Sequence, residues 1–166
     1  GLTQALIREV SKFREKGTVY LTSTLLLKSG LSFFVYIAII IAINLLGYSA
    51  ETKSLVYVSG LIMLLDQLTL SFWGVFRGFQ NLKFEAISVV INQTIIVGVG
   101  FTVLFLHLPL IYLMLPFICG STFNLLFSAF NVRRKIGLKF EWKVDRAVIK
   151  FLLKLAIPFA LISLES

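Results

Sequence analysis

The sequence contains little charge, and this shortage limits what kind of protein it can be. Of its 166 residues only 14% are charged, compared with roughly 25% in an average soluble domain. Hydrophobic residues make up 58%, more apolar side chain than a soluble domain of this length can bury. High hydrophobicity also excludes a disordered chain, which would be polar and highly charged. The composition therefore predicts an integral membrane protein.

Cysteine and histidine are also scarce, since Cys119 and His107 are the only residues of their kinds. A single cysteine cannot form an intramolecular disulfide, and no cysteine–histidine spacing typical of a metal site occurs. The sequence contains none of the motifs of serine hydrolases, zinc proteases or phosphate-binding loops. His107 is expected to be an ordinary turn residue. We therefore predict no enzymatic activity, no cofactor and no metal site.

Long runs without charge predict five membrane-crossing helices. After a connector at 1–17, the expected helices cover residues 18–47, 54–76, 86–106, 109–131 and 146–166, the last continuing beyond the end of the sequence. Between Glu85 and Arg133 no residue is charged. That run has room for two spans of the ~20 residues that a bilayer requires. Pro109 is expected to separate these two helices, and Pro116 to kink the second.

The connector has the pattern of an amphipathic helix. Leu2, Leu6, Val10 and Phe13 recur at helical spacing, while basic residues occupy another face. Such a helix is typical of a solvated or interfacial segment, and Gly17 is expected to end it. Farther along the chain, alternating apolar residues at 136–144 fit either an extended strand at the membrane surface or an irregular loop.

Basic residues are distributed unevenly along the chain, whose net charge is +8. All but two of the 16 Lys and Arg residues lie before the first predicted helix, between the second and third, or after the fourth. The exceptions are Lys28, within the first helix, and Lys53. Such asymmetry predicts that the basic segments face the cytoplasm, with Trp73 near that interface. Cations at helix ends point to a membrane surface, so nucleic acid is not an expected partner.

Three charged residues in or beside the apolar runs are candidate cavity or ion-binding residues: Asp66, Lys28 and Arg77. A carboxylate at mid-membrane costs about 2.5–3.5 kcal/mol, so Asp66 should either face a water-filled cavity or pair with another helix. Lys28 either extends to the interface or lines an inner cavity that attracts anions. Arg77 is expected near the cytoplasmic mouth of such a cavity.

Polar and small residues inside the runs point mainly to helix packing. Asn92 and Asn124 are expected to form hydrogen bonds between helices. Gly98 and Gly100 should allow two helices to approach closely.

Three segments carry a resemblance to a known family. They read ALIREVSKFREKG near the start, LSFWGVFRGFQNLKFEAI after the second predicted helix, and VDRAVIKFLLKLAIPFALISL near the end. Together they resemble the oligosaccharide flippases of polysaccharide biosynthesis, in the multidrug/oligosaccharidyl-lipid/polysaccharide exporter superfamily. The resemblance implies an all-α, polytopic transmembrane bundle with two six-helix lobes. This chain would be an internal piece of such a protein and would form most of one lobe.

The resemblance also implies a function. Such a protein moves an oligosaccharide linked to polyprenyl pyrophosphate, such as an O-antigen repeat unit, from the inner to the outer leaflet of the cell membrane. Its partners would be the lipid bilayer and the lipid-linked oligosaccharide, with a coupling ion left open. One alternative is a multidrug or cation extruder of the same superfamily. Another is a membrane scaffold or anchor subunit that transports nothing.

Overall fold

The computed structural model describes residues 2–137 and 148–150, and there the chain is an all-α helical bundle, as predicted. Its α-helices are α1 (Leu2–Lys12), α2 (Gly17–Leu45), α3 (Ala50–Gly78), α4 (Lys83–Phe105) and α5 (Leu115–Asn131). Short 3₁₀ segments, η1 (Arg14–Lys16) and η2 (Leu110–Met114), precede α2 and α5, and a π-helical turn, η3 (Val132–Ile136), follows α5.

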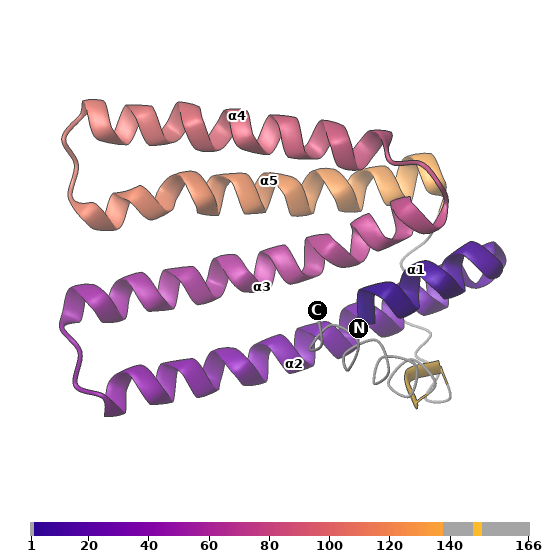
Figure 1. The fold of residues 1–166 in the computed structure, drawn as a ribbon, viewed down its shortest axis with the longest axis horizontal. Coiled ribbons are helices and arrows are strands. Elements are labelled where there is room, and N and C mark those ends of the chain that lie inside the picture. The colour runs from indigo at the N-terminus through magenta and orange to yellow at the C-terminus, as the bar shows by residue number, and fades with distance from the viewer. Residues whose placement is uncertain (1, 138–147, 151–166) are drawn as a thin grey trace, which may run out of the picture.

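The four long helices lie side by side along one axis, in the spatial order α4, α5, α3, α2 (Figure 1). The α2–α3 and α4–α5 turns lie at one end of the bundle, and the α3–α4 turn lies at the other. Helix α1 is at this second end, where it packs against both α2 and α3. The bundle thus has two distinct ends, and α1 contributes to only one of them.

Within residues 2–137, four helical stretches are long and apolar enough to cross a membrane: Arg14–Leu45, Ala50–Gly78, Lys83–Phe105 and Leu110–Ile136. Large apolar side chains cover their outer surfaces, as lipid contact requires; Phe34, for example, is 74% exposed. The fifth predicted helix, 146–166, lies outside the described residues apart from 148–150, and so does most of the segment 136–144.

Two prolines lie where the chain passes from α4 to α5. Pro109 does lie in a break between helices, because α4 ends at Phe105, His107 adopts a positive φ of 51° and η2 starts at Leu110. Pro116 lies at the change from the 3₁₀ segment η2 to helix α5, which begins at Leu115. Proline is common in the first turn of an α-helix, where its lack of an N–H costs least. The kink expected at Pro116 stays a prediction.

Helix α1 is a packed element, not a free interfacial connector. Ala5, Leu6 and Val10 are fully buried, in a core cluster that also contains Val75 and Phe76 of α3. The helix ends at Lys12, because Phe13 leaves helical geometry with φ −128° and ψ 71°. The expected stop at Gly17 was therefore wrong. Gly17 has φ −54° and is the first residue of α2.

Close approach of α1 to α3 depends on two glycines that are one turn apart on α3. A methyl group added at Gly78 would lie 2.9 Å from Cγ1 of Val10 and 3.3 Å from the carbonyl oxygen of Ile7. One added at Gly74 would lie 3.2 Å from Cδ2 of Leu6. Small residues four apart are a common means of bringing membrane helices together.

The glycines expected to serve this purpose do not do so. A methyl group added at Gly98 would meet nothing within 4 Å, and one at Gly100 would make only an ordinary contact with Pro116 at 3.7 Å. On α5 it is Gly120 that makes room for a neighbour, because an added methyl group there would collide with the side-chain oxygen of Asn92 on α4.

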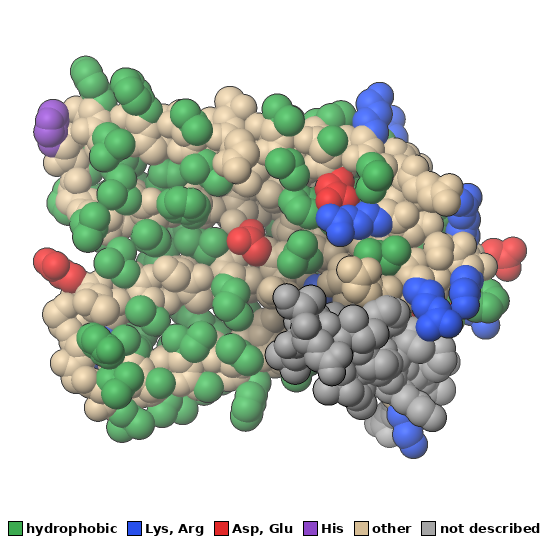
Figure 2. Space-filling view, viewed as in Figure 1, with side chains coloured by type: hydrophobic (Ala, Val, Ile, Leu, Met, Phe, Trp, Pro, Cys, Tyr) green, Lys and Arg blue, Asp and Glu red, His purple; other side chains and the backbone are tan. Residues whose placement is uncertain are grey.

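Charge is concentrated at one end of the bundle. Figure 2 shows Lys and Arg side chains gathered around α1 and the α3–α4 turn, while the histidine lies at the opposite end. The exposed cations at the basic end include Arg8, Lys12, Arg14, Lys16, Lys83, Arg133, Arg134 and Lys135. The Lys and Arg residues that are unevenly distributed along the sequence are thus gathered at one end of the folded bundle.

Candidate functional site

Lys28 lies inside the bundle, where α1, α2 and α3 meet. Its side chain is only 7% exposed. The ammonium nitrogen donates to the hydroxyl oxygen of Thr3 on α1 at 2.8 Å and to the backbone carbonyl of Gln67 on α3 at 3.4 Å. Lys28 therefore points into the protein and does not extend to the interface. We call this group of Thr3, Lys28 and Gln67 the Lys28 junction.

Both recorded hydrogen-bond acceptors of the Lys28 ammonium are neutral oxygens. Ser71 donates its hydroxyl to the same Gln67 carbonyl at 3.3 Å. Thr24, one helical turn before Lys28, is fully buried, and its hydroxyl has no hydrogen-bond partner among the described residues. Across residues 2–137 and 148–150, no carboxylate lies within ion-pair distance of Lys28. An ammonium in such surroundings is only partly compensated, and an anionic oxygen would compensate it better.

Asp66 is next to Gln67 in the sequence but lies on a different face of α3. It is exposed on the described bundle, and in the part of the chain that the structure describes it takes part in no ion pair. A single residue turns an α-helix by about 100°, so the two neighbours point in different directions. The structure therefore does not join Asp66 to Lys28.

Arg77 lies in the last turn of α3 and spans the short connection to α4. Its Nε donates to a carboxylate oxygen of Glu85 at 2.9 Å, and a second guanidinium nitrogen also contacts that carboxylate. Arg77 is 42% exposed and Glu85 14% exposed. Arg77 follows Asp66 by eleven residues, or roughly 16 Å along a helix. Lys28 thus lies in an interior junction, Asp66 on a face of the bundle and Arg77 at one end of it.

Two partners in the Lys28 junction could not be identified from the sequence. Gln67 contributes a main-chain oxygen, which every residue has, and Thr3 belongs to a helix that looked peripheral. A usable signal was the Gly74 and Gly78 pair, whose four-residue spacing marks the α3 face on which α1 packs.

Polar contacts join the other helices. Ser88 of α4 forms a hydrogen bond with the side chain of Asn124 on α5, in line with the interhelical role expected of Asn124. The side-chain oxygen of Asn92, for which the same role was expected, is buried and has no hydrogen-bond partner among the described residues. The indole nitrogen of Trp73 on α3 donates to the hydroxyl of Ser128 on α5 at 3.2 Å. These contacts link α3, α4 and α5 and contain no charged group, so they have a structural role.

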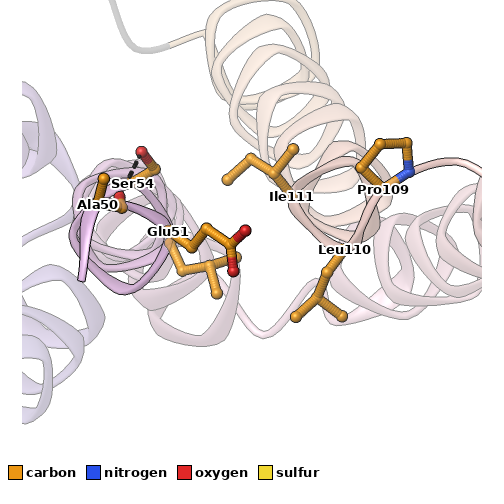
Figure 3. Close-up of a pocket in the computed structure, with 7 residues that line it drawn as sticks. Ala50, Glu51, Ser54, Pro109, Leu110 and Ile111 are labelled. Atoms are coloured by element: carbon orange, nitrogen blue, oxygen red, sulfur yellow. Dashed lines mark hydrogen bonds between the residues drawn. The ribbon is translucent and has the colours of Figure 1, made fainter.

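A pocket of about 290 Å³ opens at the end of the bundle opposite α1, between the start of α3 and η2 (Figure 3). Glu51 is its charged residue, and Leu110 and Ile111 supply much of its apolar lining. Ser54 donates its hydroxyl to the Ala50 carbonyl at 3.0 Å and is thereby engaged within its own helix. This pocket contains none of the three candidate residues.

Long apolar helices and an interior cation together define a multi-pass membrane protein with a polar junction between its helices. A family model for polysaccharide biosynthesis proteins matches residues 1–165, and the chain belongs to that family. No curated protein and no solved structure matches the chain. Members of the family are transporter-like flippases. The chain is therefore a membrane protein with a polysaccharide-related transport role, and the resemblance drawn from the sequence is confirmed.

Proposed function

We propose that the protein is a flippase that moves an oligosaccharide linked to polyprenyl pyrophosphate from the inner to the outer leaflet of the cell membrane. The observation that carries this proposal is the buried Lys28 junction, considered together with the family to which the chain belongs. A pyrophosphate group carries several negative charges, so it needs cationic compensation on its way through an apolar layer. Lys28 offers such compensation inside the bundle.

The route begins at the basic end of the bundle, which we propose faces the cytoplasm. Exposed Lys and Arg side chains there raise the local concentration of an anionic headgroup. Arg77 lies at this end, with Glu85 neutralising part of its charge. Lys28 lies deeper, where Thr3 and Gln67 hold its ammonium until a phosphate oxygen replaces one of them. Rocking of two lobes about a midplane cavity would then expose the headgroup to the other side.

Asp66 has a separate place in this proposal. An exposed carboxylate in the apolar zone is costly unless water or a further protein surface covers it. We propose that Asp66 faces the water-filled translocation cavity, where it either carries a coupling proton or ion or keeps the cavity hydrated. Translocation forms and breaks no covalent bond, so the proposal requires neither a catalytic residue nor a cofactor.

The interior charge also separates this proposal from its alternatives. A positive Lys28 repels a cationic drug, which disfavours a multidrug extruder. A scaffold that transports nothing would need the Lys28 junction only for packing. Purified protein in liposomes, given a fluorescent lipid-linked oligosaccharide on one side and a cationic dye in a parallel assay, distinguishes these functions. We expect the sugar lipid to cross and the dye to remain.

A matched pair of variants tests the role of Lys28. Lys28→Met removes the charge but keeps the length of the side chain, and we expect it to lower sugar-lipid flipping severalfold. Lys53→Met, near the opposite end of the bundle, should leave the rate unchanged. Thermal unfolding of both variants shows whether the Lys28 variant still folds. Unchanged flipping by a folded Lys28→Met protein would refute the role proposed for Lys28.

A further inference from the structure

The elbow that joins α1 to α2, residues 13–16, forms a basic pocket together with the end of α1. Its backbone is held by hydrogen bonds from Phe13 N to the Glu9 carbonyl at 2.9 Å and from Lys16 N to the Phe13 carbonyl at 3.0 Å. The pocket has a volume of about 570 Å³ and is lined by Ser11, Lys12, Phe13, Arg14, Glu15 and Lys16. Three cations and one carboxylate therefore surround one short turn of the chain.

The elbow lies at the start of a helical stretch that is long and apolar enough to cross a membrane. That stretch begins at Arg14 and is longer than an apolar layer of ~30 Å requires, so its basic first turn can lie among the lipid headgroups. Phe13, between the cations, is 51% exposed, which suits an aromatic ring at the boundary between headgroups and acyl chains. The guanidinium of Arg14 lies 5.5 Å from the centroid of the Phe79 ring, and this contact orients it beside the α3–α4 turn.

We propose that the elbow binds the headgroup of an anionic glycerophospholipid. Lys12, Arg14 and Lys16 surround the lipid phosphate, and an acyl chain lies against Phe13. The three cations outnumber Glu15, so a lipid with a net negative charge is favoured, while the ammonium of a zwitterionic headgroup meets like charge. None of the pocket residues belongs to the Lys28 junction, but Lys12, Arg14 and Lys16 are among the cations of the basic end, where the proposed transport route begins. Lipid binding at the elbow is therefore measured directly and not through flipping, so that the failure of one proposal can be told from the failure of the other.

The experiment uses phosphatidylglycerol and phosphatidylcholine as probes. Each lipid is titrated into the detergent-solubilised protein. Native mass spectrometry counts the bound lipids, and the rise in unfolding temperature measures the stabilisation that they give. The test variant carries Lys12→Gln, Arg14→Gln and Lys16→Gln. Its control carries Arg133→Gln, Arg134→Gln and Lys135→Gln, which removes the same charge from exposed residues at the same end of the bundle.

We expect the wild type and the control to bind phosphatidylglycerol in preference to phosphatidylcholine, and the elbow variant to lose that preference. Each cation near an anionic lipid contributes a factor of about five, so affinity should fall at least tenfold. The proposed site would be overturned if both triple variants lost the preference for phosphatidylglycerol equally, or if neither variant lost it. If the elbow variant does not fold, Glu15→Gln decides the matter. Removal of this carboxylate should tighten binding, and unchanged binding would overturn the site.

Discussion

Lys28 places a formal charge where the surrounding helices supply only neutral oxygens. Its two hydrogen bonds, to the hydroxyl of Thr3 and to the carbonyl of Gln67, offset part of the cost of taking an ammonium out of water. An anionic acceptor would add direct charge–charge attraction to these hydrogen bonds. The ammonium of the Lys28 junction is therefore held by neutral oxygens, and we propose that an anionic oxygen of the substrate replaces one of them.

The direction of Lys28 could not be predicted from the sequence. A lysine near the end of a long apolar run can extend outwards along its flexible stem or turn inwards, and composition does not distinguish the two. What decides the matter is a helix from elsewhere in the chain that places Thr3 within reach. Trp73 is a similar case. The sequence predicts a position near the inner interface but not the partner on α5, Ser128, to which the indole donates.

For Asp66 we predict that Asp66→Asn lowers flipping of the sugar lipid severalfold without changing expression, insertion or unfolding temperature. The amide keeps the size and hydrogen-bonding capacity of the carboxylate and removes only its charge. Flipping is measured in liposomes at several pH values.

Glu51→Gln is the matched control for Asp66→Asn. Glu51 is also an exposed acid of α3, and it lines the pocket at the end of the bundle opposite α1. It should behave as wild type. If Asp66→Asn flips at the wild-type rate at every pH, the carboxylate has a structural role only.

At the scale of helices, α1 is the element whose position the sequence indicated least well. Its apolar stripe was visible, but a stripe of that kind fits a membrane surface as well as a protein surface. The structure shows the stripe buried on α3, where Gly74 and Gly78 leave room for it. Long charge-free runs were easier to interpret, because only a helix can satisfy its own backbone groups in lipid.

This packing of α1 predicts that Gly78→Leu is destabilising. The new side chain would meet Val10 and the Ile7 carbonyl, and overpacking of this kind costs about 1–3 kcal/mol. We expect a lower unfolding temperature. We also expect faster tryptic cleavage after Arg8 and Lys12, because α1 would be pushed away from α3.

Gly98→Leu is the control, since a methyl group added there meets nothing within 4 Å. Its unfolding temperature and cleavage pattern should match those of wild type. Equal effects of the two substitutions would show that the close approach of α1 to α3 contributes nothing measurable to stability.

For the molecule as a whole, the sequence predicted the class and the family but not the packing order of the helices. Composition and charge-free runs lead to a multi-pass helical bundle on general physical grounds. The same grounds do not predict the spatial order α4, α5, α3, α2. Lipid tails are as apolar as the helix surfaces, so the hydrophobic effect does not favour one helix neighbour over another. That choice depends on small-residue contacts such as Gly120 with Asn92, and on hydrogen bonds such as Ser88 with Asn124.

The two ends of the bundle differ in charge, and from this we predict how the molecule sits in the membrane. Basic loops are retained on the cytoplasmic side, so the α3–α4 turn should face inwards and the α2–α3 turn outwards. Cysteines introduced by Ser49→Cys and Leu82→Cys report on these two turns, since both positions are exposed. The exposed Cys119 is first replaced by serine, so that each variant has a single thiol.

A thiol reagent that cannot cross the membrane is added to intact cells. It should label the Ser49→Cys variant and spare the Leu82→Cys variant. After the cells are permeabilised, both variants should react equally, which confirms that both thiols are accessible to the reagent. The opposite labelling pattern would place the basic end outside. The anionic headgroup would then meet the cations on leaving the membrane and not on entering it, and the inner-to-outer direction proposed for transport would have to be reversed.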